Sequence, residues 1–312
     1  MSHPLTVTTS SNIKFAEFLS DEGVLVNIGP FIYRIRSSIP SIAANLFKLY
    51  TGQILFNKVA AETFIDFDVS IHPPSWLRRL VNKQVQFYFD DNIAFNPFPL
   101  HHATAMLEWG MNWCVSSHIH TYLIIHAAII ERNGLAAVMP APPGSGKSTL
   151  CASLVQEGWR LLSDELTLID LNDYKAVPLP RPIGLKNQSI ELIRHYYPDA
   201  VFGVVSSDTL KGSICHLKPP DSSIALQHVT CPVRWIVFPK FEAEAKTELV
   251  ERPKGQAFME IANNAFNYSM LGVAGFDVLK NVVDRADCFD FKYSRLDEAI
   301  EVFANLSVLH EI

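Results

Sequence analysis

Short apolar runs alternate with turn residues through the first hundred residues, and such alternation is typical of β-strands. The runs that predict strands are Val24–Ile28, Phe31–Ile35, Phe64–Phe67 and Val85–Phe89. One helix is expected near Ser41–Tyr50, and the stretch Asp91–His101, which contains two prolines, is the best candidate for a boundary. The pattern therefore predicts a smaller, mostly β module at residues 1–100 and a second domain at residues 101–312.

Beyond this boundary, apolar positions recur at helical spacing and then at strand spacing. The expected elements are a helix from about Ala103, strands at Leu123–Ile130 and Leu135–Met139, a helix at Lys147–Gln156 and a strand at Trp159–Leu162. Further helices are expected at Gln256–Phe266, Phe276–Val283 and Leu296–Leu306. The pair Asn133-Gly134 is a hairpin signal between the first two strands. This order of strands and helices predicts an α/β domain.

Composition excludes several classes of protein. The net charge of −6 argues against nucleic-acid binding, because phosphate backbones are held by an excess of Lys and Arg. The five cysteines are scattered and form no C-x-x-C pair, which suits a reducing cytoplasm. The N-terminus lacks the layout of a signal peptide, and the apolar run Tyr122–Ile130 is too short to span a bilayer. We therefore expect a cytoplasmic protein without a membrane span.

The segment Ala141–Ser148 fits a phosphate-binding loop, in which Ala or Gly is followed by four residues and then by Gly-Lys-Ser/Thr. Gly144 and Gly146 lack a Cβ atom, so the backbone can curl and direct its N–H groups at phosphate oxygens. Lys147 can reach the β- and γ-phosphates, and the Ser148 hydroxyl can bind Mg²⁺. We expect ATP and Mg²⁺ here, with the nucleotide held by Pro143, Gly144, Ser145, Gly146, Lys147, Ser148 and Thr149.

Two further residues lie at informative distances from this loop. Asp164 comes 17 residues after Lys147, at the carboxyl end of the next predicted strand, where open α/β sheets bind their ligands. It should lie beside the γ-phosphate and could take the proton from an attacking hydroxyl. His126 comes 21 residues before Lys147, in the strand that precedes the hairpin, and is a candidate active-site histidine.

These motifs resemble the bacterial HPr serine kinase/phosphorylase family, which shares a fold with phosphoenolpyruvate carboxykinase. The matching segments are His126–Ile130, Pro143–Ser148 and Gly158–Glu165, in the order of that family's histidine, P-loop and double-acid motifs. The chain is more similar to the branch called HPr-kinase-related kinase A, through Gly29–Phe31, Glu108–Trp113, Arg181-Pro182, Leu185–Asn187, Lys211-Gly212, His216–Pro220 and Asn264–Tyr268. The resemblance implies a P-loop kinase domain of that fold behind a smaller N-terminal module. It also implies Ser148 as Mg²⁺ ligand, Asp164 as catalytic base and His126 in the active site.

The sequence departs from the HPr kinases at the second acidic position, where Glu165 replaces an aspartate, and at Ala141, where they have glycine. It also lacks their downstream Leu-Glu-x-Arg-Gly-x-Gly signature, which carries a metal-binding glutamate. Glu191 lies at a comparable distance in different surroundings, so Glu165 and Glu191 are both candidate metal ligands. These departures argue against HPr as the acceptor and against reverse phosphorolysis.

The cations Arg181, Lys186 and Lys211 stand in loops that contain Pro or Gly, and are candidates for neutralising a transferring phosphoryl group. We predict an ATP- and Mg²⁺-dependent kinase acting on a serine-type hydroxyl of a peptide or protein. Two alternatives are a kinase of a small-molecule alcohol and a nucleotide-binding switch with little chemistry. Asp164 speaks against the switch, because a carboxylate beside a triphosphate weakens binding unless metal or catalysis needs it. The sequence leaves the acceptor, the nucleotide preference and homo-oligomerisation open.

Overall fold

The computed structural model describes residues 9–55 and 63–308, with side chains described at 14–55 and 63–306. The chain forms two compact units. The first comprises Met1–Cys114 and Val201–Lys218, and the second comprises Val115–Ala200 and Pro219–Ile312. A single boundary near residue 100 does not produce this division, because a segment from the middle of the chain belongs to the first unit. Whether residues 1–100 fold by themselves stays a prediction.

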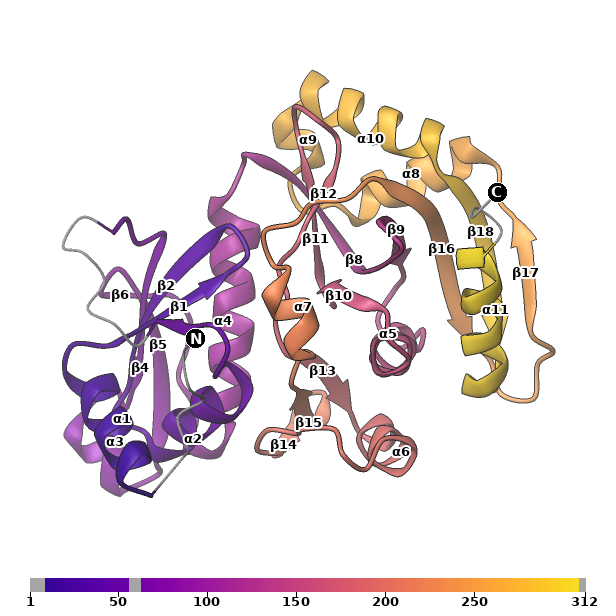
Figure 1. The fold of residues 1–312 in the computed structure, drawn as a ribbon. Helices are drawn as coiled ribbons and strands as arrows, with labels where there is room; N and C mark the ends of the chain where they lie inside the picture. The colour runs from indigo at the N-terminus through magenta and orange to yellow at the C-terminus, as the bar shows by residue number, and fades with distance from the viewer. Residues whose placement is uncertain (1–8, 56–62, 309–312) are drawn as a thin grey trace, which may run out of the picture. The chain divides into compact units, whose positions relative to one another are not determined.

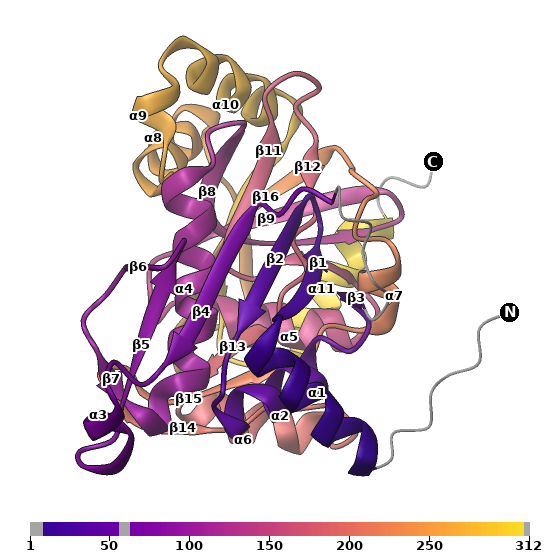
Figure 2. The ribbon, with the colours of Figure 1, turned by 90° about the vertical axis from the view of Figure 1, so that its left-hand side faces the viewer.

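The first unit is built on a sheet that is antiparallel except for one parallel pair, β2 with β4. The strand order is β3 (Ile54–Leu55), β1 (Val24–Ile28), β2 (Phe31–Arg36), β4 (Phe67–His72), β5 (Gln84–Phe89) and β6 (Asn92–Ile93), with β7 (Phe98–Pro99) beside β5. Figure 2 shows β1, β2, β4 and β5 side by side. β1 and β2 bury every second residue, which is the alternation that the sequence predicts.

The first unit contains more helical residues than the prediction of a mostly β module implies. They are α1 (Thr9–Asp21), α2 (Pro40–Leu49), α3 (Trp76–Leu80), the 3₁₀ helix η1 (Leu100–His102) and the first part of α4 (Ala103–His118). Of these, α2 and α4 are predicted by the apolar pattern, and α1 and α3 are not. α1 buries Phe15 and Leu19 one turn apart, and α3 buries no residue, so neither carries a long apolar stripe among its described side chains.

The strand predicted at Phe64–Phe67 is wrong in position, because β4 begins at Phe67 and continues to His72. Phe64 is exposed, whereas Phe67, Val69 and Ile71 are buried at strand spacing. The segment that returns to this unit adds a hairpin of β14 (Ser206–Thr209) and β15 (Gly212–Leu217). The first unit is therefore a mixed α/β module.

The second unit contains an eight-stranded mixed sheet. Its order is β12 (Ala176–Val177), β11 (Leu166–Asp170), β8 (Tyr122–Arg132), β9 (Leu135–Pro140), β16 (Val233–Phe241), β18 (Asp287–Tyr293) and β17 (Glu248–Glu251), with β10 (Arg160–Ser163) also paired to β8. A short strand, β13 (Ile183–Lys186), belongs to the same unit. β9 and β18 both run parallel to β16, so the carboxyl ends of these three strands point the same way.

The helices of the second unit are α5 (Lys147–Gln156), α6 (Gln188–Tyr196), α7 (Asp221–Ala225), α8 (Lys254–Asn264), α9 (Tyr268–Leu271), α10 (Val273–Arg285) and α11 (Leu296–Val308). The predicted helix at Lys147–Gln156 is confirmed at both ends. Alternate residues of β8, from Leu123 to Ile129, form a core with residues of α8 and α10, while α5 contacts β8 and α11 (Figure 1). Within the described residues, no helix combines the length and apolar character needed to cross a membrane.

The predicted hairpin between β8 and β9 is confirmed. Asn133 and Gly134 both have positive φ values, 55° and 80°, as a tight two-residue turn requires. The carboxylate of Glu131 accepts a hydrogen bond from the Gly134 N–H and pairs with the buried Arg160 of β10. This turn sets the register between β8 and β9, and therefore the position at which β9 ends and the following loop begins.

Candidate active site

The loop between β9 and α5 contains two glycines with positive φ, Gly144 and Gly146. Pro142, Pro143 and Gly144 are exposed, and the chain then enters α5 through Gly146 in the left-handed conformation, at φ 86°. A Cβ atom on Gly146 would lie 2.5 Å from the Tyr293 hydroxyl oxygen, so any other residue here would be strained and would displace that hydroxyl. The amino end of α5 therefore opens directly onto the loop, where its dipole favours an anion.

Two residues that the sequence did not indicate hold this loop from outside. The N–H of Phe241, at the end of β16, donates to the Ser145 carbonyl oxygen at 2.9 Å. The hydroxyl of Tyr293, at the end of β18, donates to the Gly146 carbonyl oxygen at 3.1 Å. Because both carbonyl oxygens accept hydrogen bonds from residues at the ends of β16 and β18, the loop conformation is held without a bound ligand.

Lys147 is the first residue of α5 and is only 8% exposed. Burial lowers the pKa of its ammonium group, and the charge of Lys186 acts in the same direction. The carboxylates of Asp164 and Glu165 oppose this shift. The buried cation therefore lies within electrostatic reach of both acidic residues that follow β10.

Asp164 is positioned by an irregularity in β10. The pairing of β10 with β8 shifts register between Leu161 and Ser163, as in a β-bulge, and the Leu162 carbonyl accepts a hydrogen bond from the Leu179 N–H at 2.7 Å. The Ser163 hydroxyl oxygen then accepts hydrogen bonds from the N–H groups of the two residues after Asp164. Bulges of this kind re-aim side chains beside functional sites.

The carboxylate of Asp164 is buried and only half satisfied. Its Oδ2 accepts a hydrogen bond from the Gly184 N–H at 3.0 Å, whereas Oδ1 has no hydrogen-bond partner among the described residues. Burial and the charge of Glu165 raise the pKa of Asp164 to about 6, against the lowering effects of Lys147, the Gly184 N–H and the Ser148 hydroxyl. An aspartate in this state has one oxygen that can accept a proton.

Two adjacent residues of β8 lie beside the loop and beside the acidic turn, which consists of Asp164 and Glu165 between β10 and β11. Ala127 pairs with Pro140, the last residue before the loop, and His126 pairs with Leu166, the first residue after the acidic turn. His126 alternates with the core residues of β8 and is therefore on the other face of the strand. The candidate histidine thus lies between the two motifs, and its role in the active site stays a prediction.

The other candidates differ in where the structure places them. Glu165 and Lys186 are exposed, and their charges act on Lys147. Arg181 is buried just ahead of β13, whose Gly184 binds Asp164. Glu191 is exposed on α6, pairs with Arg194 at 3.0 Å and is not among the charges that shift the pKa of Lys147 or Asp164. Lys211 belongs to the first unit, in the turn between β14 and β15, whereas Lys147 and Asp164 belong to the second.

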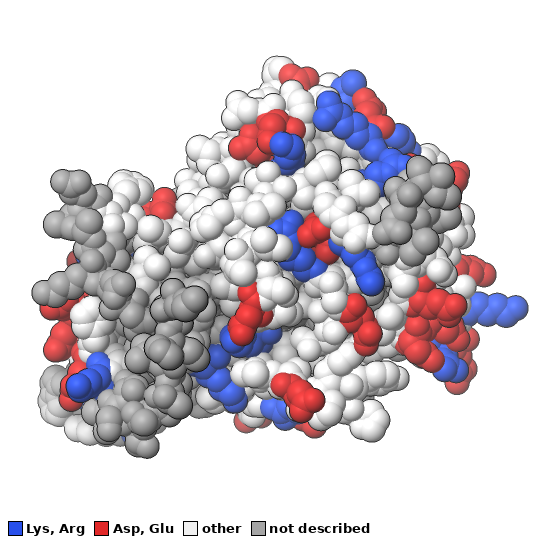
Figure 3. Space-filling view, viewed as in Figure 1, with Lys and Arg blue, Asp and Glu red and all other residues white. Residues whose placement is uncertain are grey.

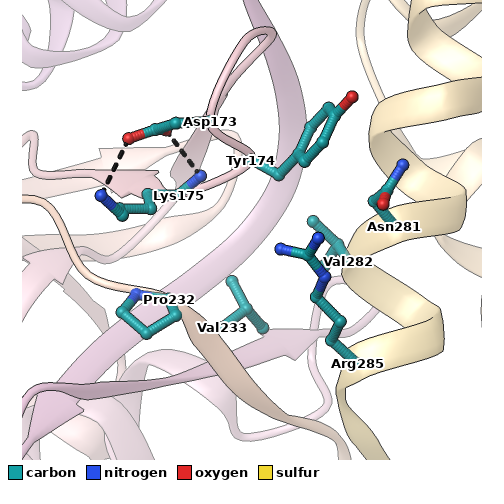
Figure 4. A pocket seen from close by; sticks show the side chains of 8 residues that line it. All are labelled: Asp173, Tyr174, Lys175, Pro232, Val233, Asn281, Val282 and Arg285. Atoms are coloured by element: carbon teal, nitrogen blue, oxygen red, sulfur yellow. Dashed lines mark hydrogen bonds and ion pairs between the residues drawn. The ribbon is translucent and has the colours of Figure 1, made fainter.

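A small cavity elsewhere in the second unit shares no residue with this cluster (Figure 4). It lies between the β11–β12 turn, the start of β16 and the end of α10. Its lining residue Val233 is eight positions before Phe241 on β16, which corresponds to about 26 Å along a strand. In the cavity Arg285 lies over the Tyr174 ring and Asp173 pairs with Lys175, so these charges already have partners.

Charges and donor types limit what the site can bind. No three His, Cys, Asp or Glu side chains in the described part of the chain gather as a metal site. The Ser148 hydroxyl and the carboxylates of Asp164 and Glu165 instead provide a few oxygen donors, which suit Mg²⁺ held mainly by a nucleotide and water. On the face shown in Figure 3, basic and acidic residues are interspersed rather than gathered in a basic field.

Comparison with known proteins gives partial similarities. Residues 103–229 match a family model described as "SynChlorMet cassette protein ScmC". No curated protein matches the chain. The structure of the Hpr(Ser) kinase/phosphatase from Coxiella burnetii is similar over 61% of this chain and 99% of that one, at 10% identity and a TM-score of 0.29.

Proposed function

We propose that this chain is an ATP- and Mg²⁺-dependent kinase that phosphorylates a serine-type hydroxyl of a peptide or protein. The observation that carries the proposal is the state of Asp164, buried beside the phosphate loop with Oδ1 unpartnered among the described residues and a pKa of about 6. Buried polar atoms are nearly always paired, and exceptions need an explanation such as catalysis. A pKa near 6 keeps the group ionised at neutral pH and makes it a stronger base than an ordinary aspartate.

The loop fits the triphosphate of a nucleotide. Gly146 gives the backbone its curl, Lys147 provides a buried positive charge, and the Ser145 hydroxyl oxygen is buried without a partner among the described residues. Ser148 and Glu165 are the residues best placed to share Mg²⁺ with the phosphates. When bound, Mg²⁺ would neutralise charge on the phosphate oxygens.

In the proposed reaction, Asp164 is the general base and Lys147 the charge that steadies the phosphates. Asp164 Oδ1 accepts the proton of the acceptor hydroxyl while that oxygen forms its bond to the γ-phosphorus. The bond from the γ-phosphorus to the β–γ bridging oxygen breaks, and ADP leaves with those electrons. Lys147 and the loop N–H groups hold the phosphate oxygens throughout this change.

Replacement of Asp164 by asparagine tests this proposal. Asp164→Asn keeps the shape of the side chain but cannot accept the proton, so phosphoryl transfer should fall on the order of a hundredfold or more. Nucleotide affinity, measured by calorimetry, should equal that of the wild type or exceed it, because a carboxylate opposes the phosphates. Asp284→Asn, on an exposed turn of α10, is the matched control and should alter neither quantity.

The two measurements separate the alternatives. Loss of transfer and affinity together would mean that Asp164 is a metal ligand or a structural residue rather than the base. If neither changes, Asp164 is not the base and the proposed mechanism is wrong. Nucleotide binding without any phosphoryl transfer in the wild type would instead identify a nucleotide-binding switch.

A further inference from the structure

The segment between α8 and α9 is fixed to β8 by one side chain, Asn267, which is fully buried. Its Oδ1 accepts a hydrogen bond from the Ile124 N–H at 2.9 Å, and its Nδ2 donates to the carbonyl oxygens of Tyr122 and Ile119 at 2.8 and 3.4 Å. The N–H of Phe266 donates to the Ile124 carbonyl oxygen at 2.8 Å. This set of bonds gives the segment one defined position on the edge of β8 that β11 does not use.

The consequence of this anchoring is the position of Phe266. Its ring meets the ring of His126 edge-on, with the centroids 5.8 Å apart, yet the residue remains 48% exposed. His126 pairs with Leu166 at the end of the acidic turn, and its neighbour Ala127 pairs with Pro140 at the start of the loop. Phe266 therefore borders the candidate active site with about half of its surface accessible.

The residues next to Phe266 in the sequence carry no charge. From Ile261 to Phe276 there is no Asp, Glu, Lys, Arg or His, although a segment of sixteen residues would hold about three at the chain's charged fraction of 19%. After Phe266, the same segment exposes Met270 at 68%, Val273 at 78% and Phe276 at 46%. Exposed apolar residues and a deficit of charge together are typical of the centre of an interaction surface.

We infer that Phe266 and the exposed apolar residues after it bind an apolar stretch of polypeptide beside the acceptor hydroxyl. The inference rests on the proposed kinase function and specifies its substrate class as a peptide or protein whose acceptor serine is flanked by apolar rather than charged side chains. Four exposed side chains, that of Phe266 before α9 and three on α9 and α10, exceed what one small alcohol could contact. Charged flanking residues would gain no partner from this segment and would lose water on binding.

The test uses two short peptides of equal length, one with a single serine between leucines and one with the leucines replaced by aspartates. The full-length wild-type protein should show a KM at least tenfold lower for the leucine peptide. Phe266→Ser should raise the KM for the leucine peptide about tenfold, equivalent to about 1.4 kcal/mol, with kcat and nucleotide affinity little changed. Met270→Ser is a second variant at a more exposed site, and Val250→Ser, on the exposed strand β17, is the control that should keep the preference.

The outcomes distinguish failure of the peptide-binding inference from failure of the proposed kinase function. Phosphorylation of both peptides with equal KM, or a leucine preference that persists in Phe266→Ser and Met270→Ser, would overturn the inference and leave the kinase function standing. If the wild type binds ATP but phosphorylates neither peptide, the proposed function fails and the inference fails with it. Unchanged nucleotide affinity in the variants shows that the site is still folded.

Discussion

The Tyr293 hydroxyl donates a hydrogen bond of 3.1 Å to the Gly146 carbonyl oxygen, and this bond joins the end of β18 to the residue that opens α5. The same hydroxyl oxygen occupies the space that a Cβ atom on Gly146 would need. The absent side chain of one residue and the phenol of the other are therefore complementary. Burial raises the pKa of Tyr293, so the phenol stays protonated and remains a donor at physiological pH.

Tyr293→Phe should weaken nucleotide binding without unfolding the protein. The ring would still stack on Phe291, whose centroid is 5.3 Å away, but the loop would lose one hydrogen bond of about 0.5–1.5 kcal/mol. We expect calorimetry to show roughly a two- to tenfold loss of affinity. Tyr197→Phe removes a phenol that bonds Glu157 outside the loop, and is the control that should leave affinity unchanged.

Lys147→Ala should remove most phosphoryl transfer. The loss of one preorganised charge typically costs about 3 kcal/mol, or roughly a hundredfold in rate. The fold should persist, because burial lowers the pKa of Lys147 and the charged form is not what stabilises the folded chain. Wild-type turnover in this variant would remove the loop from the mechanism.

Ser148→Ala should raise the Mg²⁺ concentration needed for half-maximal activity. The hydroxyl lies near the Asp164 carboxylate and is the loop oxygen best placed to bind a metal. Ser153→Ala is a matched control on the same helix, since its hydroxyl donates to the Thr149 carbonyl oxygen. An identical metal titration in all three proteins would rule Ser148 out as a ligand.

The pH dependence of kcat/KM should have an acidic limb near pH 6. This parameter reports the essential groups of the enzyme without bound substrate, and Asp164 must be ionised to act as a base. Since the pKa of Asp164 is raised to about 6, activity should rise as pH increases through that value. A limb near pH 4 would show that the base is an ordinary, solvated carboxylate instead.

Stability should respond to pH with the opposite sign. Between pH 3.8 and about 6 the native Asp164 holds a proton that the unfolded chain has released, so the free energy of unfolding falls as pH rises through this window. The shift corresponds to an upper value of about 3 kcal/mol. Asp164→Asn should therefore be more stable than the wild type at pH 7 and show no such gain below pH 4. Denaturant unfolding at the two pH values measures this, and equal differences at both would contradict it.

Local patterns in the sequence were sufficient for the elements around the loop. The helix at Lys147–Gln156 and the turn at Asn133-Gly134 are both predicted by turn chemistry and apolar spacing, which act over a few residues. The structure places Asp164 within electrostatic reach of Lys147 and pairs His126 with Leu166, while the roles assigned to Asp164 and His126 stay predictions.

What remained hidden depends on contacts between distant segments. β16 and β18 pair in parallel, and each of them reaches the loop with its last residue, Phe241 or Tyr293. No short-range signal marks either residue, because an aromatic at the end of an apolar run is ordinary core composition. The sequence pattern also did not predict that Val201–Lys218 belongs to the first unit, because this depends on contacts between segments far apart in the chain.

The register shift in β10 also limits how the segment around Asp164 could evolve or be engineered. Two residues of β10, Leu162 and Ser163, advance while β8 advances by one, from Ile130 to Ile129. Leu162 is the extra residue of this bulge, because Ser163 still pairs with Ile129. Removing Leu162 would take away the local bend of the strand and the carbonyl oxygen that accepts from the Leu179 N–H. A protein shortened by that one residue would keep every proposed catalytic group in its sequence and still change the direction in which the chain enters Asp164. Single-residue insertions and deletions between Leu161 and Asp164 should thus be tolerated far less than substitutions of similar size there.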